Sequence, residues 1–423
     1  MLSVHGLVRG RNMELGRDAD TGGQVLYVVE AARHIAAHPD VARVDLMTRR
    51  ITDTHVSADY AQSIEVLSSK ARIVRIEAGP EGYIRKEELW EYLDSFADNA
   101  LAFLRAEGST PDIIHSHYAD AGYVGSRLAN LLGVPLVHTG HSLGRVKRRR
   151  LIASGLKRDV IEDRYHMARR IEAEELALGS ASLVIASTAN EIEEQYGLYD
   201  YYQPEQMRVI PPGTDLLRFK PPDGSEQSEP VAADIARFLR EPAKPMILAL
   251  SRPDERKNIA TLVRAYGESA TLQNLANLVV VTGNRDDIRD LDSGAQQVLN
   301  DLLLDIDRYD LYGRVAYPKH HRREEVPIIY RLAAASRGVF INPALTEPFG
   351  LTLIEAAASG LPVVATSDGG PRDIVGNCHN GYLIDPLNTE DIVSNLLKVL
   401  KDQETWANLS RAGLQQVQEH YSW

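Results

Sequence analysis

The sequence predicts an α/β protein that consists of two doubly wound, parallel-sheet domains. Short runs of β-branched residues alternate with helical segments along the chain, which is the pattern of repeated βαβ units. The alternation stops at a proline-rich stretch near residue 211 and starts again near residue 245. In addition, 423 residues exceed the length that one hydrophobic core usually supports.

The expected strands fall into two series. The first covers residues 43–48, 112–115, 136–138, 183–187 and 207–210, and the second covers 245–251, 278–282, 314–317, 338–341 and 362–366. Residues 3–5 resemble the end of an earlier strand, and residues 421–423 stop where a helix would continue. We therefore expect the natural chain to be longer at both ends.

The domain boundary is expected at the sequence PPGTD, residues 211–215. The two Rossmann-like domains then cover residues 1–211 and 212–405, and residues 406–423 form a last helix that crosses back toward the first domain. Two such domains would face each other across a cleft, with 211–215 as the hinge. Ligands would gather outside the carboxyl ends of both sets of strands.

Composition narrows the class of protein. A formal net charge of −12 argues against a nucleic-acid binder, because affinity for phosphate backbones needs clustered excess lysine and arginine. The single cysteine, Cys378, cannot form an internal disulfide. No apolar stretch is long enough for a membrane span, and no signal peptide is recognisable. We expect a cytoplasmic protein without a membrane partner.

A glycine turn opens the helix expected over residues 25–37. Gly22 and Gly23 at a helix start would let backbone N–H groups approach an anion or a hydroxyl, although a plain turn with a helix cap explains them equally well. Asp18 and Asp20 just before them have the spacing of a metal-binding DxD motif. Without a second carboxylate cluster we favour no metal site.

A polar strand end and a basic run follow in the first domain. His141 comes directly after the strand at 136–138, so we favour a position in the cleft over a buried structural histidine. The run GRVKRRR, residues 144–150, and Arg169 with Arg170 in the helical run 161–178 are either a solvated face or a site for a phosphorylated acceptor. The pattern alone leaves both open.

The second domain carries two pairs of charged residues after successive strands. Arg252 and Lys257 lie five residues apart across a turn, so both can reach one diphosphate. Glu347 precedes a helix start near Leu351, and Glu355 lies on that helix, where a carboxylate can accept hydrogen bonds from two ribose hydroxyls. Each pair is common by itself, but the occurrence of both pairs in this order after successive strands is not common.

These motifs resemble those of retaining glycosyltransferases of the GT-B fold. More closely, the chain is similar to the cyanobacterial type of the sucrose-phosphate synthase family from about His5 to Trp423. The resemblance is carried by ELGRDADTGGQ (14–24), HSHYADAG (115–122), HSLGR (141–145), MARRIEAEE (167–175) and ALTEPFGL (344–351).

The resemblance implies roles for individual residues. The acceptor, fructose 6-phosphate, would be held by Gln24, Lys86, Tyr118, Ser142, Lys147, Arg169 and Arg170. The nucleotide sugar would be held by Gly22, Gly23, Arg252, Lys257, Glu347, Phe349, Gly350, Leu351 and Glu355. The catalytic set would be His141, Arg252, Lys257 and Glu347.

The reaction implied is transfer of glucose from UDP-glucose, or from ADP-glucose, to fructose 6-phosphate with retention, giving sucrose 6-phosphate. The diphosphate would leave on the same face that the acceptor attacks and would take the proton of the acceptor hydroxyl. We expect no essential metal or other cofactor, because arginine, lysine and a helix N-terminus can neutralise the diphosphate. A separate phosphatase would consume the product.

Three alternatives stay open. A sucrose synthase-like transferase would use unphosphorylated fructose, and its acceptor would need no basic cluster. A non-catalytic sugar-nucleotide sensor would bind the donor without turnover. An epimerase on the same scaffold would need an acid and a base on either side of the sugar, and no pair of residues is as well placed for that.

Overall fold

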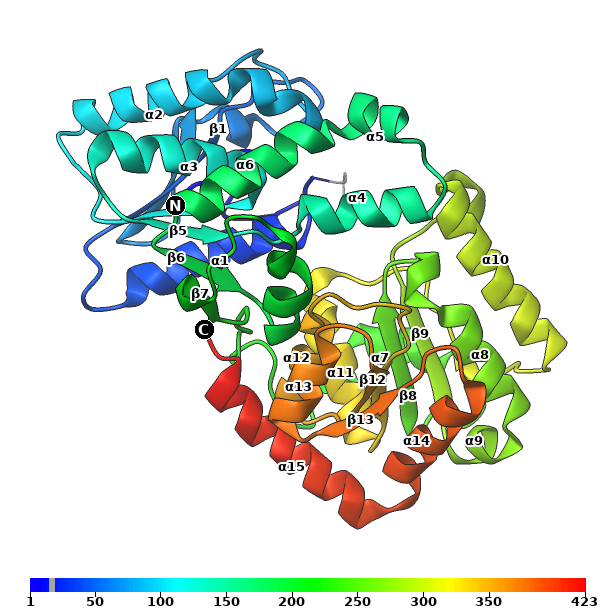
Figure 1. Cartoon of the computed structure of the whole chain (residues 1–423). Coiled ribbons are helices and arrows are strands. Elements are labelled where there is room, and N and C mark those ends of the chain that lie inside the picture. Colours follow the sequence, from blue (N-terminus) through cyan, green and yellow to red (C-terminus); the bar gives the residue numbers. More distant parts are fainter. Residues whose placement is uncertain (15–19) are drawn as a thin grey trace. The chain divides into compact units, whose positions relative to one another are not determined.

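In each half of the chain, the β-branched runs form a parallel sheet that is buried on both faces by helices (Figure 1). The computed structural model describes residues 1–14 and 20–423. It divides into two units, residues 1–210 and 211–423, and the division falls at the proline-rich stretch. Each unit is described by itself below.

The sheet of the first unit is built around the N-terminal residues. Leu2 forms bridges to Met47 on one side and to Ser116 on the other, so it joins two groups of strands with the order β2-β3-β1 and β4-β5-β6-β7. Among the described strands of this unit, β2 alone is antiparallel to its neighbour. The strands are β1 (Val44–Arg49), β2 (Ile64–Val66), β3 (Ala71–Ile76), β4 (Ile114–His117), β5 (Leu136–Thr139), β6 (Leu183–Ala186) and β7 (Met207–Val209).

Helices connect these strands on both faces of the sheet. The α-helices are α1 (Gly23–Ala37), α2 (Leu93–Ala106), α3 (Tyr118–Leu132), α4 (Gly144–Ala153), α5 (Arg158–Tyr165) and α6 (Met167–Ser180). The short helical turns are η1 (Ala58–Ala61), η2 (Lys86–Tyr92), η3 (Glu191–Gln195), η4 (Tyr196–Leu198) and η5 (Pro204–Gln206).

The sheet of the second unit is parallel throughout, with the order β10-β9-β8-β11-β12-β13. Its strands are β8 (Met246–Ser251), β9 (Asn277–Thr282), β10 (Val315–Ala316), β11 (Val339–Asn342), β12 (Val363–Thr366) and β13 (Gly381–Ile384). Its α-helices are α7 (Pro230–Ala236), α8 (Ile259–Glu268), α9 (Ala270–Leu275), α10 (Ser293–Arg308), α11 (Val326–Ala335), α12 (Leu351–Ala358), α13 (Pro371–Cys378), α14 (Thr389–Lys401) and α15 (Gln403–His420), with short turns η6 (Glu226–Ser228), η7 (Glu255–Lys257), η8 (Ile288–Asp290) and η9 (Arg323–Glu325).

Alternate residues of the central strands enter separate cores. In β8, Ile247 packs in one core with helices α8, α10 and α14, whereas Leu248 packs in the other with α7, α11 and α12. In the first unit Leu46 and Met47 divide in the same way. This two-sided burial follows from the period of two along a strand and explains why the sequence of these strands is almost continuously apolar.

The expected strands all correspond to observed ones, but β2, β3 and β13 were not expected. Strand β3 has the sequence ARIVRI, in which two arginines interrupt the apolar run. Arg75 is nevertheless buried, because it donates to the carbonyl of Val8 and pairs with Glu65. Strand β13 lies at the sheet edge and only its last residue is buried.

Two expectations about helices need correction. The helical run expected over 161–178 is two helices, α5 and α6, which are separated at His166 by a left-handed backbone conformation with φ 45°. The helix expected over 406–423 begins at Gln403, and it packs against α12, α13 and α14 of the same unit (Figure 1). Within residues 1–14 and 20–423, no helix has both the length and the apolar character to span a membrane.

Two glycines of the second unit should respond in opposite ways to alanine. A Cβ on Gly381 would lie 1.8 Å from the carbonyl oxygen of Val363 in the paired strand, so Gly381→Ala should destabilise the unit by about 1–3 kcal/mol. Gly376 is exposed in α13, and a Cβ there meets nothing within 4 Å, so Gly376→Ala should stabilise it by about 0.5–1 kcal/mol. Urea denaturation measures both, and equal effects would contradict the packing described here.

Candidate active site

Two strained residues mark the carboxyl edge of the first sheet. Tyr118 follows β4 with φ 79°, and His141 follows β5 with φ 59°. Positive φ is unusual for residues other than glycine, and such conformations cluster at functional sites. The predicted acceptor residue and the predicted catalytic histidine are therefore both held in costly backbone conformations at the ends of neighbouring strands.

His141 belongs to a group of imidazoles. Its Nε2 lies 3.0 Å from Nδ1 of His117, and the edge of the Tyr27 ring meets both rings. Burial, together with His138 and His5, lowers the pKa of His141 to about 3. His141 is therefore neutral at physiological pH and can donate or accept a hydrogen bond without carrying charge.

Three of the predicted acceptor cations, Lys86, Lys147 and Arg170, lie close enough for their charges to interact. The Arg170 guanidinium lies 4.6 Å from the centre of the Tyr118 ring and donates to the carbonyl of Ser142. Lys147 is half-buried, and burial, with the positive charges of Arg170 and Lys86, lowers its pKa to about 8. Cations that repel one another in this way form a site that an anion would stabilise.

Lys86 and Arg170 each already have a carboxylate partner that sequence reasoning did not assign. The Lys86 ammonium bonds Asp20, whose other oxygen accepts from the backbone N–H of Lys86 and from Tyr83. Asp20 had been weighed only as part of a metal motif, and Asp18 lies outside the described residues. Arg170 donates to Glu174 one helical turn further along α6, a spacing that could have revealed the pair.

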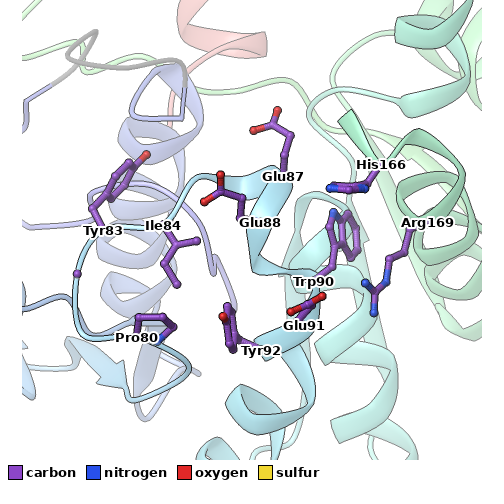
Figure 2. Close-up of a pocket in the computed structure, with 11 residues that line it drawn as sticks. Pro80, Tyr83, Ile84, Glu87, Glu88, Trp90, Glu91, Tyr92, His166 and Arg169 are labelled. Carbon is purple, nitrogen blue, oxygen red and sulfur yellow. The ribbon is translucent and has the colours of Figure 1, made fainter. Parts of the chain in front are cut away.

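Arg169 points away from this group. Adjacent residues on a helix differ by about 100° in direction, so Arg169 and Arg170 face different sides of α6. Figure 2 shows Arg169 beside Trp90 and Glu91, across a cavity of about 450 Å³ from Tyr83. The structure thus brings Lys86, Tyr118, Lys147 and Arg170 together and places Arg169 at a separate pocket.

The rest of the basic run in α4 is mostly solvent-facing. Arg145 pairs with Glu175 and Asp200, whereas Arg149 and Arg150 are exposed. Of the two interpretations of this run, the structure therefore supports a solvated face for its end and leaves Lys147 as the cation that faces Arg170.

The glycine turn lies at the start of α1, as predicted. Gly22 is the N-cap residue, and no side chain caps the helix, so its first N–H groups have no partner on the helix itself. A Cβ at Gly22 or Gly23 would meet nothing within 4 Å. Packing therefore does not require glycine at either position. The Gln24 amide lies 3.5 Å from the Ser3 hydroxyl.

In the second unit, Lys257 and Glu347 form one hydrogen-bonded group. The Lys257 ammonium lies 2.7 Å from Oε2 of Glu347, which also accepts from the Asn342 amide at 3.0 Å. Asn342 ends β11, and the sequence analysis missed it. Arg252 is exposed, and its guanidinium makes no hydrogen bond or ion pair with the described part of the chain, although its backbone carbonyl accepts from Ser251 and Asp254. Of the two residues predicted to bind the diphosphate, Lys257 is thus anchored by a carboxylate, and the Arg252 side chain has no such partner.

Glu355 lies on α12, with its carboxylate accepting from the Tyr330 hydroxyl at 3.1 Å. Burial raises the pKa of Glu355 to about 7, although the Tyr330 bond and the charges of Arg218 and Arg323 act against the rise. The helix starts after Gly350, whose φ of 105° turns the chain from Phe349 into Leu351. The N–H groups at this start have no partner within the helix.

A second glycine loop, which sequence reasoning did not single out, packs on the Glu347 segment. A Cβ on Gly369 would lie 2.2 Å from the Glu347 carbonyl oxygen, and one on Gly370 would lie 2.4 Å from that of Phe349. The Gly370 N–H donates to the Glu347 carbonyl. The sequence SDGGP after β12 was the available signal.

No group of three or more histidine, cysteine, aspartate or glutamate side chains is arranged to hold a metal ion in the two described ranges, 1–14 and 20–423. The expectation that the reaction needs no metal is not tested by this observation and stays a prediction.

Comparison with known families decides the family. A family model described as the sucrose synthase first GT-B domain matches residues 1–215. The chain belongs to the sucrose synthase and sucrose-phosphate synthase family of GT-B glycosyltransferases. A second model, glycosyl transferases group 1, matches residues 232–416. The predicted GT-B fold and the predicted family are therefore confirmed.

Relatives of the family agree with this assignment. The chain is 47% identical to the sucrose-phosphate synthase of Zea mays over 100% of its own length and 46% of the relative's, and 47% identical to a probable sucrose-phosphate synthase 1 of Oryza sativa subsp. indica over 100% and 45%. The chain thus spans less than half the length of these relatives.

Solved structures share the fold. The sucrose-phosphate synthase of Thermosynechococcus elongatus superposes with a TM-score of 0.73 at 28% identity, over 100% of this chain and 94% of that one. Anabaena HepE in complex with UDP-glucose gives a TM-score of 0.64 at 17% identity, over 96% and 94% of the two chains, and it shows the likeness of fold alone.

The raised pKa of Glu355 predicts a pH-dependent effect of Glu355→Gln. The folded protein binds this proton more tightly than the unfolded chain does, so the associated stability is complete below about pH 4.5 and is lost as the pH rises through 7. Glutamine has no such loss and should make the second unit more stable than the wild type at pH 8, by up to about 3 kcal/mol, but not at pH 4.5.

Urea denaturation at the two pH values measures this difference. Tyr330→Phe is the matched variant, because it removes the hydrogen bond that stabilises the ionised carboxylate and should increase the loss of stability at pH 8. An effect of Glu355→Gln that is equal at both pH values would show that Glu355 ionises normally in the folded protein.

Proposed function

We propose that this protein is a sucrose-phosphate synthase, which transfers glucose from UDP-glucose to fructose 6-phosphate with retention. The observation that carries the proposal is the group of three cations Lys86, Lys147 and Arg170, in which the Arg170 guanidinium packs on the Tyr118 ring. Three cations held close together, one of them a lysine with a lowered pKa, suit a phosphate dianion better than a neutral sugar.

The acceptor is proposed to bind to the first unit. Its phosphate would compensate the repulsion among the positive charges of Lys147, Arg170 and Lys86. The fixed guanidinium of Arg170 would orient the phosphate. The glycine turn at Gly22 and Gly23 would admit a ligand close to the backbone, which is consistent with the open space at both positions. Fructose without phosphate would leave Lys147 without an anionic partner, because Lys86 and Arg170 already pair with Asp20 and Glu174, and this is the physical basis for discrimination.

The nucleotide sugar is proposed to bind to the second unit. Arg252 and Lys257 would neutralise the diphosphate as the glycosidic bond breaks, Glu347 and the N–H groups at the start of α12 would hold glucose hydroxyls, and Glu355 would hold ribose. Glu355 would enter the complex ionised, with two hydroxyl donors replacing the solvation that burial removes.

Catalysis would rest on charge compensation rather than on an enzyme nucleophile. The acceptor hydroxyl would attack the anomeric carbon on the face that the diphosphate leaves, its proton passing to the departing oxygen. Donors aimed at the developing charge contribute about 3–4 kcal/mol each in such reactions.

We further propose that no metal is needed and that a separate phosphatase consumes sucrose 6-phosphate. The cytoplasmic location stays a prediction from the lone cysteine.

The function is tested by release of UDP from UDP-glucose in the presence of fructose 6-phosphate, fructose or no acceptor. We expect turnover that depends on the phosphorylated acceptor. Equal turnover with fructose would favour a sucrose synthase-like activity, and binding of UDP-glucose without turnover would favour a sensor. The same assay with ADP-glucose measures the preference for the base.

Lys147→Met tests the phosphate site without breaking a buried ion pair. We expect the KM for fructose 6-phosphate to rise about 10–100-fold, since a charged hydrogen bond to the phosphate contributes about 1.5–3 kcal/mol, with little change in the KM for UDP-glucose. Arg149→Met is the control, because Arg149 is exposed on the same helix. Equal effects of the two variants would show that the phosphate of the acceptor does not bind at Lys147.

Arg252→Met tests the diphosphate site. Arg252 has no ion pair in the described chain, so the substitution should leave folding intact while kcat/KM falls about 100-fold or more. Arg256→Met in the same loop removes an exposed arginine that pairs with Asp254 and should retain most of the activity. Loss of activity in both variants would indicate damage to the loop, not to the diphosphate contact.

A further inference from the structure

The bond between His117 and His141 joins the ends of two neighbouring strands. His117 is the last residue of β4, its side chain is fully buried, and its Nδ1 lies 3.0 Å from Nε2 of His141. The ring planes of the two histidines are tilted by 34°, and the Tyr27 ring meets each of them edge-on. The pair is thus packed as a unit, and His141 can hardly turn its ring without losing contact with His117 and Tyr27.

Both members of the pair are neutral. The groups that act on it from the neighbouring elements are His115, His138, His5 and the N-terminal amino group, all of which oppose a positive charge. Burial is the largest cause, and it lowers the pKa of His117 far below its ordinary value. A bond between two neutral imidazoles needs one N–H and one lone pair, so only two arrangements of hydrogen are possible.

The surroundings of His117 distinguish the two arrangements. Its Nε2 is buried and has no hydrogen-bond partner in the described part of the chain. If His141 donated the bond, the hydrogen of His117 would sit on this Nε2 and be an orphaned buried donor. If His117 donates, Nε2 carries only an unused lone pair. Orphaned buried N–H groups are rarer than unused acceptors, so His117 is the donor.

We propose that His117 is a positioning residue that fixes His141 in the tautomer with hydrogen on Nδ1. Nε2 of His141 then accepts from His117, and the remaining ring nitrogen, which makes no hydrogen bond to the described chain, can act only as a donor. This inference rests on the proposed function for its purpose. A neutral N–H that is fixed in direction suits a hydroxyl oxygen of the transferring glucose, and it cannot deprotonate the sugar.

The tautomer can be measured without any assay of activity. In protein labelled with ¹⁵N-histidine, long-range ¹H–¹⁵N correlation spectra separate protonated from unprotonated ring nitrogens, and His141→Gln identifies the signals of His141. We expect His141 to carry hydrogen on Nδ1 in the wild type and to shift toward the Nε2 form in His117→Leu. An Nε2 form in the wild type, or the same form in both proteins, would overturn the proposal.

Kinetics supply the second test. We expect kcat to fall about 10–100-fold in His117→Leu with the KM for fructose 6-phosphate nearly unchanged, because the lost interaction lies on the glucose side. His117→Asn should recover most of the activity, since its amide N–H can replace Nδ1–H. His115→Leu is the packing control, because His115 is a half-buried neighbour that bonds Thr139 and not His141.

The two tests separate the failure of this inference from the failure of the proposed function. If the protein transfers no glucose at all but the tautomer shifts as expected, the positioning role stands and the function falls. If transfer to fructose 6-phosphate is observed but His117→Leu and His115→Leu lower kcat equally, with no rescue by His117→Asn, the function stands and the positioning role is refuted.

Discussion

The first unit depends on one buried carboxylate, that of Glu174. It accepts from Nε of Arg170, from the backbone N–H of Gly144 at the start of α4, and from the hydroxyl of Tyr199. Burial raises the pKa of Glu174, and these donors oppose the rise. One carboxyl group thereby connects α6, the start of α4 and Tyr199, and the two helices carry cations proposed for the acceptor phosphate. Removing Arg170 alone would take a hydrogen-bond donor from this buried carboxyl group, which is why Lys147 is the better probe of that site.

The two units use the same arrangement for their lysines. Lys86 bonds Asp20 in the first unit, and Lys257 bonds Glu347 in the second. Ordering a lysine side chain costs conformational entropy. A carboxylate partner that is already fixed offsets this entropy cost before a ligand binds. A phosphate that arrives then finds the ammonium in place and exchanges one anion for another. The exchange keeps charge nearly balanced in both the free and the bound protein.

The parts of the fold that follow from strand periodicity could be predicted from the sequence. Both series of strands, the boundary near Pro211 and the start of α12 rest on such local signals. Strand β3 could not be predicted in the same way, because Arg75 is made compatible with burial by Glu65 and the Val8 carbonyl, which are distant in the chain. The break at His166 has a similar origin, since a left-handed residue inside a helical pattern leaves no trace in composition.

The residues of the candidate site can also be divided into those that local sequence signals predict and those that depend on contacts between distant segments. Motifs placed Lys147, Arg170, Lys257 and Glu347, but they could not show which neighbouring arginine turns inward, because a one-residue step on a helix changes the face. Nor could they supply Asn342, Glu174 or His117, whose roles arise only from contacts between strand ends.

Several of the energetic costs in this structure fall on residues of the proposed chemistry. Tyr118 and His141 have strained backbones, Lys147 and Glu355 lose solvation, and His117 leaves a buried nitrogen unused. A bound ligand can relieve the lost solvation of Lys147 and Glu355, but not the cost at His117. A phosphate stabilises Lys147, and hydroxyl donors stabilise Glu355, but no ligand reaches the buried nitrogen of His117. Ligand binding therefore does not explain why this nitrogen has no partner. The explanation is the hydrogen bond that the other ring nitrogen of His117, Nδ1, donates to His141.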